Sequence, residues 1–171
     1  MGRVVVLCLL SLLMLISSLP AQQPAARVCV ASITGSAGNL SAEQSRDRLV
    51  DLLKRQKQPV DAVALESASP EGAASEAQEK GCGFVVYAEI TELHTEREHV
   101  YGTTTGVGPT AFNYFATVKY KLEKTSVGAV VGSGNAKARD SSAQETAVLQ
   151  ALKPLAGKIA SDVRKNAGAA K

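Results

Sequence analysis

The amino-acid sequence predicts an α/β protein with a single mixed sheet and helices packed on it. Three observations support this prediction. In the first half, short apolar runs alternate with amphipathic helical patterns, which favours parallel strands joined by right-handed crossovers. In the second half, a long run alternates apolar and polar residues, as an antiparallel strand with one exposed face does. An amphipathic stretch near the carboxyl end completes the order β-α-β-α-β-β-β-α.

The first predicted elements are short apolar strands that alternate with helices. The strands are predicted at 27–34, 60–65 and 82–90. A capping box at 41–44, S-A-E-Q, starts the first helix, and Pro59 closes it. The second helix starts at Ser69, with proline at its first helical position, and Gly81 ends it.

The second half is predicted to hold two antiparallel strands and a helix. Residues 112–123 alternate cleanly, and the run 129–139 is weakened by glycine, so we expect it at the sheet edge. Ser142 and Glu145 form a second capping box, and Pro154 is expected to kink the last helix by freeing a carbonyl.

The amino-terminal residues predict a secretory signal peptide over residues 1–21. One positive charge precedes an apolar run, and small residues follow up to the expected cleavage near Ala21. The alternative is an uncleaved membrane anchor, but the apolar run over 4–16 is short for a bilayer span. Cys8 follows Leu7 where a bacterial lipobox has a small residue, so lipid attachment is not expected. The sequence therefore predicts a periplasmic or secreted protein with no stable transmembrane segment after cleavage.

The rest of the chain predicts one domain. Residues 22–26 are expected to be a linker, 27–166 a single α/β domain, and 167–171 a flexible tail. Lys and Arg number 19 against 16 Asp and Glu, and both signs are mixed along the chain. The sequence lacks the basic stripe that nucleic-acid binding needs, so nucleic acid is not an expected partner.

The stretch Y-G-T-T-T-G-V-G-P over 101–109 has the glycines and hydroxyls that phosphate-binding loops also use. Such a loop needs a lysine and a helix start directly after a buried strand. Here an alternating strand follows, and the next lysine is Lys119, so a phosphate site is not predicted. We expect a flexible link from Glu96 to Thr110, and links of that length in compact domains are often functional.

No catalytic or cofactor-binding constellation emerges from the sequence. The G-x-S-x-G motif is missing, and neither Cys29 nor Cys82 sits in a recognisable nucleophile setting. His94 and His99, with nearby glutamates at 96 and 98, offer a zinc alternative. On a strand the two histidines point to opposite faces, so we interpret the stretch as solvated charge. We therefore predict a non-enzymatic protein without metal or cofactor.

Removal of the signal peptide leaves two cysteines, Cys29 and Cys82. An even number in an oxidising compartment permits one disulfide. The two residues are expected near the same end of adjacent parallel strands, which hold side chains slightly too far apart for an easy bridge. The alternative is that both cysteines are small buried fillers.

Several segments resemble the small α/β domain shared by the TolB amino-terminal domain, the penicillin-binding-protein activator LpoB and the curli-secretion protein CsgG. These are R-V-C-V-A-S-I-T, S-A-E-Q-S-R-D-R-L-V-D-L-L and A-S-E-A-Q-E-K-G-C-G-F-V-V-Y-A-E-I, followed by the strand F-A-T-V-K-Y-K-L-E. The resemblance implies a non-enzymatic role in the bacterial envelope, either docking to other proteins or assembling into an export structure.

The predicted function is an exported module that binds an envelope protein or assembles with itself as an oligomer. The candidate contact surface joins the glycine-rich stretch to the aromatic strand: Tyr101, Gly102, Gly106, Gly108, Phe112, Tyr114 and Phe115. Phe112 and Tyr114 are interpreted first as core residues under the last helix, and Phe115 is the better surface candidate. The alternative function is a small-ligand-binding protein or secreted hydrolase, with Ser32, Thr34, Glu66 and Glu89 converging at the carboxyl ends of the parallel strands.

Overall fold

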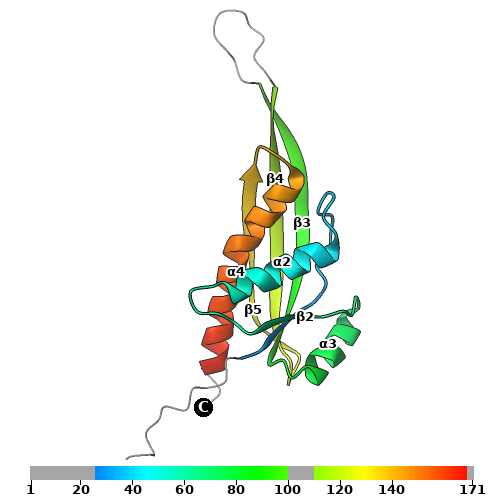
Figure 1. Cartoon of the computed structure of the whole chain (residues 1–171), viewed down its shortest axis with the longest axis vertical. Coiled ribbons are helices and arrows are strands. Elements are labelled where there is room, and N and C mark those ends of the chain that lie inside the picture. Colours follow the sequence, from blue (N-terminus) through cyan, green and yellow to red (C-terminus); the bar gives the residue numbers. More distant parts are fainter. Residues whose placement is uncertain (1–25, 100–109, 169–171) are drawn as a thin grey trace, which may run out of the picture.

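The computed structural model of the chain describes residues 26–99 and 110–168 (Figure 1). The predicted signal peptide, its cleavage site and the glycine-rich stretch 101–109 lie outside these residues. Within the described ranges, no helix is long and apolar enough to cross a bilayer.

The elements follow one another in the predicted order. In the described ranges the strands are β1 (Val28–Val30), β2 (Ala62–Ala64), β3 (Phe84–His99), β4 (Thr110–Lys124) and β5 (Ala129–Asp140). The helices there are α2 (Ala42–Lys54), α3 (Pro70–Glu79) and α4 (Gln144–Gly168).

The strands form one mixed sheet in the order β2-β1-β3-β4-β5. β1 pairs in parallel with both β2 and β3, as the two crossover helices favour. β3, β4 and β5 pair antiparallel. The predicted α/β class, the predicted pairing of the first and third strands, and the predicted edge position of the glycine-containing strand are all confirmed.

The main core lies between the sheet and the helices α2 and α4, which cover one face (Figure 1). Its fully buried side chains come from both layers and include Val28, Val86, Val118, Leu122, Leu49, Leu53, Leu152, Leu155 and Ile159. A smaller cluster lies on the opposite face, beneath α3: Cys29, Ala31, Leu65, Ala73, Ala77, Cys82 and Val85. We call the β3, β4 and β5 surface opposite α2 and α4 the outer face.

The first strand is shorter than the predicted 27–34 run. β1 ends at Val30, and Thr34 rejoins the sheet through a single bridge to Glu89. The turn that follows depends on Gly35, which has a φ of +93° and whose added Cβ would lie 2.3 Å from the Ile90 carbonyl oxygen. Only glycine meets both conditions, so the chain leaves the ladder here.

The third and fourth strands are longer than predicted. The expected link from Glu96 is wrong at its start, because the β3–β4 ladder continues to the pair His99–Thr110. Apolar alternation ends before this region because that end of the strands extends past the core, so the pattern gave no strand signal. α4 begins near Thr95, whose Oγ1 accepts a hydrogen bond from Gln144. We call 96–99 and 110–113, which project beyond the helices, the arm (Figure 1).

The predicted capping box of the last helix is also wrong. α4 begins at Gln144, so Ser142 precedes the capping position, and its backbone N–H donates to Asp140 instead. The Glu145 carboxylate accepts a hydrogen bond from the backbone of Asn39, which ties the α2 entry loop to α4. The helix continues through Pro154.

Side chains cap some of the carbonyls on both edges of the sheet. On β5, Lys158 of α4 donates to the outward carbonyl of Asn135 at 2.5 Å, and Asn166 donates to that of Val131 at 3.1 Å. On β2, Lys80 donates to the Ala64 carbonyl at 2.9 Å. Capped edge carbonyls hinder pairing with a further strand.

Candidate functional site

The outer face carries a groove whose floor is formed by β3, β4 and β5. Alternation puts Tyr87, Glu89, Lys119 and Lys121 on this side, because their neighbours in sequence point into the core. Helix α3 forms one wall. The groove has a volume of about 800 Å³ and is open to solvent. It is lined by Ser32, Thr34, Pro70, Glu71, Ala74, Tyr87, Ala88, Glu89, Lys119, Tyr120, Lys121, Glu123, Ser133, Gly134 and Asn135.

Tyr87 is the aromatic residue of this floor that points outward. It is half-buried, and its hydroxyl donates to the Pro70 carbonyl at 3.4 Å. Burial raises the pKa of this hydroxyl, and the negative charges of Glu123 and Glu71 raise it further. The two carboxylates therefore create a negative field around Tyr87.

Charges on the groove lack partners of their own. In the described part of the chain, Glu71, Glu89, Glu123, Lys119 and Lys121 form no ion pair, although other surface charges do. Unpaired charges of both signs beside an aromatic floor are available to a partner.

Further along the outer face, Phe115 lies between two basic groups. The His94 ring stacks on it with centroids 5.0 Å apart, and the Arg139 guanidinium carbon lies 5.6 Å from its centroid. Arg139 also donates to Asn113 and to Glu98, and Asn113 donates to Glu98. Phe115, the predicted surface residue, is half-buried, and the His94 ring and the Arg139 guanidinium pack on it.

The interpretation of Phe112 as a core residue is wrong. Phe112 is 40% exposed on the arm, with the Arg97 guanidinium carbon 5.7 Å from its ring centroid. Tyr114 is partly buried and packs against the core, as predicted. The other candidate surface residues, Tyr101, Gly102, Gly106 and Gly108, lie outside the described residues.

Three of the four residues predicted for the alternative ligand site lie together in the structure. Ser32, Thr34 and Glu89 line the groove. Glu66 does not: its carboxylate is exposed and lies 3.9 Å from the Arg46 guanidinium instead. The sequence did not identify Tyr87, Lys119 and Lys121 as groove residues, because their convergence depends on the register between β3 and β4.

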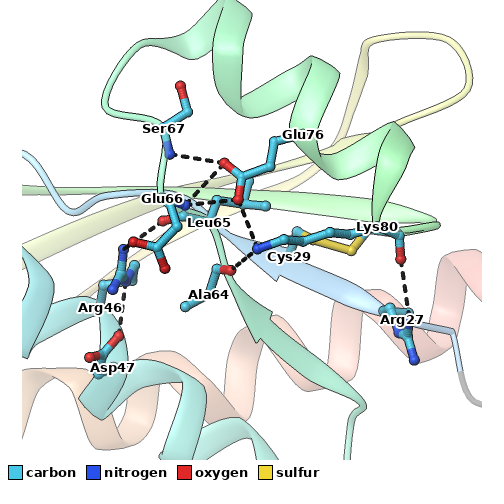
Figure 2. Close-up of polar contacts among 11 residues, drawn as sticks. Arg27, Cys29, Arg46, Asp47, Ala64, Leu65, Glu66, Ser67, Glu76 and Lys80 are labelled. Carbon is cyan, nitrogen blue, oxygen red and sulfur yellow. Dashed lines mark hydrogen bonds and ion pairs between the residues drawn. A yellow bond between two sulfur atoms is a disulfide. The ribbon is translucent and has the colours of Figure 1, made fainter.

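Below α3, a polar cluster fixes the loop that leads into the groove wall (Figure 2). The Glu76 carboxylate accepts backbone hydrogen bonds from Glu66 and Ser67, at 2.9–3.0 Å, and pairs with Lys80 at 2.7 Å. The bond from Lys80 and these backbone donors lower the pKa of Glu76 to about 2. The buried Arg46 donates to the Leu65 carbonyl at 2.6 Å from the other side.

Cys29 and Cys82 form a disulfide with a Cα separation of 5.8 Å (Figure 2). The expected obstacle, directly paired strands, does not apply. Cys29 is paired with Val85, and Cys82 lies before β3, in the turn that follows α3. Gly81, with a φ of +67°, gives that turn its shape. The bridge thus joins β1 to the carboxyl end of α3.

The histidine stretch has no metal-binding geometry in the part of the chain that the structure describes, where no group of three metal-ligating side chains occurs. Both histidine positions are on β3. The His94 ring is flanked by the carboxylates of Glu92 and Glu96 at 3.9 and 3.4 Å.

The sheet order and the packed helices define the class of this protein: a small mixed α/β domain with α2 and α4 on one face of the sheet and α3 on part of the other. Neither family models nor curated proteins match the sequence. Solved structures do match the fold. The PelC dodecamer from Paraburkholderia phytofirmans is 17% identical, with a TM-score of 0.53 over 76% of this chain and 84% of that one.

Two further structures match at a similar level. The hypothetical protein CT253 from Chlamydia trachomatis is 11% identical, with a TM-score of 0.56 over 84% of this chain and 100% of that one. Protein XCC0632 from Xanthomonas campestris, of family DUF330, is 13% identical, with a TM-score of 0.54 over 87% and 92%. At these identities the likeness shows the fold alone.

The resemblance drawn from the sequence is confirmed for two proteins. TolB from Acinetobacter baumannii matches with a TM-score of 0.46, at 13% identity over 84% of this chain and 29% of that one. The LpoB C-terminal domain from Salmonella enterica matches with a TM-score of 0.43, at 13% identity over 76% and 94%. With both scores below 0.5, these two overlays are too loose to support an inference about function.

Proposed function

We propose that this chain is an exported, non-enzymatic module of the cell envelope that binds another envelope protein or further copies of itself. The observation that carries the proposal is the presence of two exposed features, the arm and the groove. An arm with an exposed aromatic–arginine pair projects beyond the helices, and the groove beside α3 holds charges without partners. Exposed aromatic and arginine side chains are the residues most enriched at the energetic centres of protein interfaces.

Two further points support this proposal. The predicted signal peptide would bring the chain to the envelope, where the Cys29–Cys82 disulfide is stable. Among proteins with this fold, PelC is a dodecamer, so the architecture is compatible with self-assembly in at least one case.

The alternative, a small-ligand-binding protein or secreted hydrolase, keeps one supporting observation. Three of its four predicted residues line the groove. The groove is open, however, and no described histidine lines it to serve as a base for Ser32 or Ser133. Ligands of that class usually occupy enclosed pockets that bury most of their surface.

The proposal is tested by chemical cross-linking and pull-down from envelope extract. We expect Phe112→Ser, and separately the deletion of 101–108, to remove specific partners from the captured set. Val127→Ser is the matched control, since Val127 is also exposed, at 69%, but lies in the turn between β4 and β5, at the end of the sheet away from the arm. Identical captured sets for all variants and the unaltered protein would refute the proposal.

A further inference from the structure

The groove beside α3 is acidic where the helix meets the floor, and it carries two lysines further along β4. Glu71 comes from the wall and Glu123 from the end of β4 that is nearest to it, and both act on the Tyr87 hydroxyl between them. Lys119 and Lys121 lie on the β4 floor, in register with Asn135 and Ser133 of β5. The floor beyond α3 is of mixed charge, because Glu89 of β3 lies opposite Lys119. A partner that fits therefore brings a cation to the α3 side of the groove, near Glu71 and Glu123.

The arm carries such a cation. Arg97 is exposed, stacks on the exposed Phe112 ring, and forms no ion pair within the described residues. The neighbouring Glu96 points to the opposite side of the strand, where its carboxylate lies 3.4 Å from the His94 ring. Arm and groove cannot meet within one chain, because the arm projects from one end of the molecule and α3 lies toward the other (Figure 1).

Contact between copies through the sheet edges is disfavoured. Lys158 and Asn166 cap outward carbonyls of β5, and Lys80 caps one of β2. Assembly through side-chain surfaces is therefore favoured, and the groove offers charges of both signs that form no ion pair within the described residues.

Building on the self-assembly branch of the proposed function, we infer that the arm of one copy docks in the groove of a second copy. Arg97 lies between Glu71 and Glu123 of the receiving copy, and Phe112 packs against its Tyr87. Each docked copy still offers a free arm or a free groove, so the contact is head-to-tail and propagates into a ring or a filament.

The test measures the oligomeric state of the full exported chain by sedimentation velocity. Arg97→Ala/Phe112→Ser removes the arm contact, and Glu71→Lys/Glu123→Lys removes the groove contact. Either variant is expected to weaken self-association by about tenfold or more. Arg55→Ala and Glu79→Lys are the controls, since both residues are exposed and outside the arm and groove, and they should leave association unchanged.

The decisive measurement mixes the two defective variants. The intact arm of the groove variant then fits the intact groove of the arm variant, and the expected product is a dimer containing one of each. A monomeric unaltered protein, or oligomers unaffected by both variants, would overturn the inference. If the protein is monomeric but still captures an envelope partner through Phe112, the proposed function stands and only the arm–groove contact fails. Circular dichroism confirms that each variant is folded.

Discussion

At the scale of single residues, Glu76 shows how a carboxylate inside one helix organises a separate loop. Its oxygens accept the backbone N–H groups of Glu66 and Ser67, and Lys80 one turn later neutralises the charge. Charge-assisted hydrogen bonds of this kind are roughly twice as strong as neutral ones. The loop they hold leads into α3, which is the wall of the groove.

This geometry makes stability depend on pH. The pKa of Glu76 is lowered to about 2 in the folded state, so the folded protein favours the ionised form more than the unfolded chain does. The contribution is complete above the unfolded pKa and is lost as pH falls through the folded one, between about pH 5 and pH 2.

We therefore expect Glu76→Gln to lower the free energy of unfolding by about 1–3 kcal/mol at neutral pH, measured by urea denaturation. The difference from the unaltered protein should shrink steadily as the pH is lowered toward 2. Glu79→Gln, on an exposed position of the same helix, should have little effect at any pH. A pH-independent difference for Glu76→Gln would contradict the assigned role.

At the scale of elements, β5 explains why an edge strand keeps glycines. The Tyr120 ring packs over Gly134, where an added Cβ would lie 3.0 Å from the ring, and Tyr120 donates to Asp162 at 2.7 Å. At Gly132, an added Cβ would lie 2.7 Å from the Asp162 carboxylate. Glycine in this strand makes room for the Tyr120–Asp162 bond between sheet and α4. Glycine in a strand often marks such a close approach.

The Cys29–Cys82 disulfide is the covalent link between β1 and the end of α3, across 53 residues of chain. Because it restricts the unfolded chain, we expect Cys82→Ser to lower the free energy of unfolding by about 2–4 kcal/mol. Peptide mapping of the exported protein without reductant should recover the two cysteines in one linked fragment. Recovery of both as free, alkylated thiols would show that the bond does not form in the cell.

The sequence predicted elements well where burial imposes a pattern. Leu49 and Leu53 marked α2, and the alternation through Val118 and Leu122 marked β4, because these side chains point into one core. The sequence did not predict elements correctly where they are set by hydrogen bonds and not by buried side chains. Glu96–His99 continue β3 through backbone pairing with β4, and their polar side chains carry no strand signal. The capping box at Ser142 failed because Asp140 and Asn39 offered competing bonds.

At the scale of the whole molecule, the groove was less predictable than the fold. Ser32 and Thr34 were placed by the rule that parallel strands present sites at their carboxyl ends. Tyr87, Glu71 and Lys121 meet only through the antiparallel register and the position of α3, which no local pattern encodes. Helices α2 and α4 cover one face of the sheet, and α3 covers only part of the other, so the arm and the groove beside α3 stay exposed (Figure 1).

This asymmetry leads to the central claim: the molecule acts by protein contact through its arm and outer face. The direct measurement is site-specific photo-crosslinking in living cells, with a photoreactive residue at Phe112 or Lys121 and, as control, at Arg55 on the helical side. We expect protein adducts, identified by mass spectrometry as a defined partner or a second copy, at the first two positions and none at Arg55. Equal labelling at all three positions, or no adduct at Phe112 and Lys121, would contradict the claim.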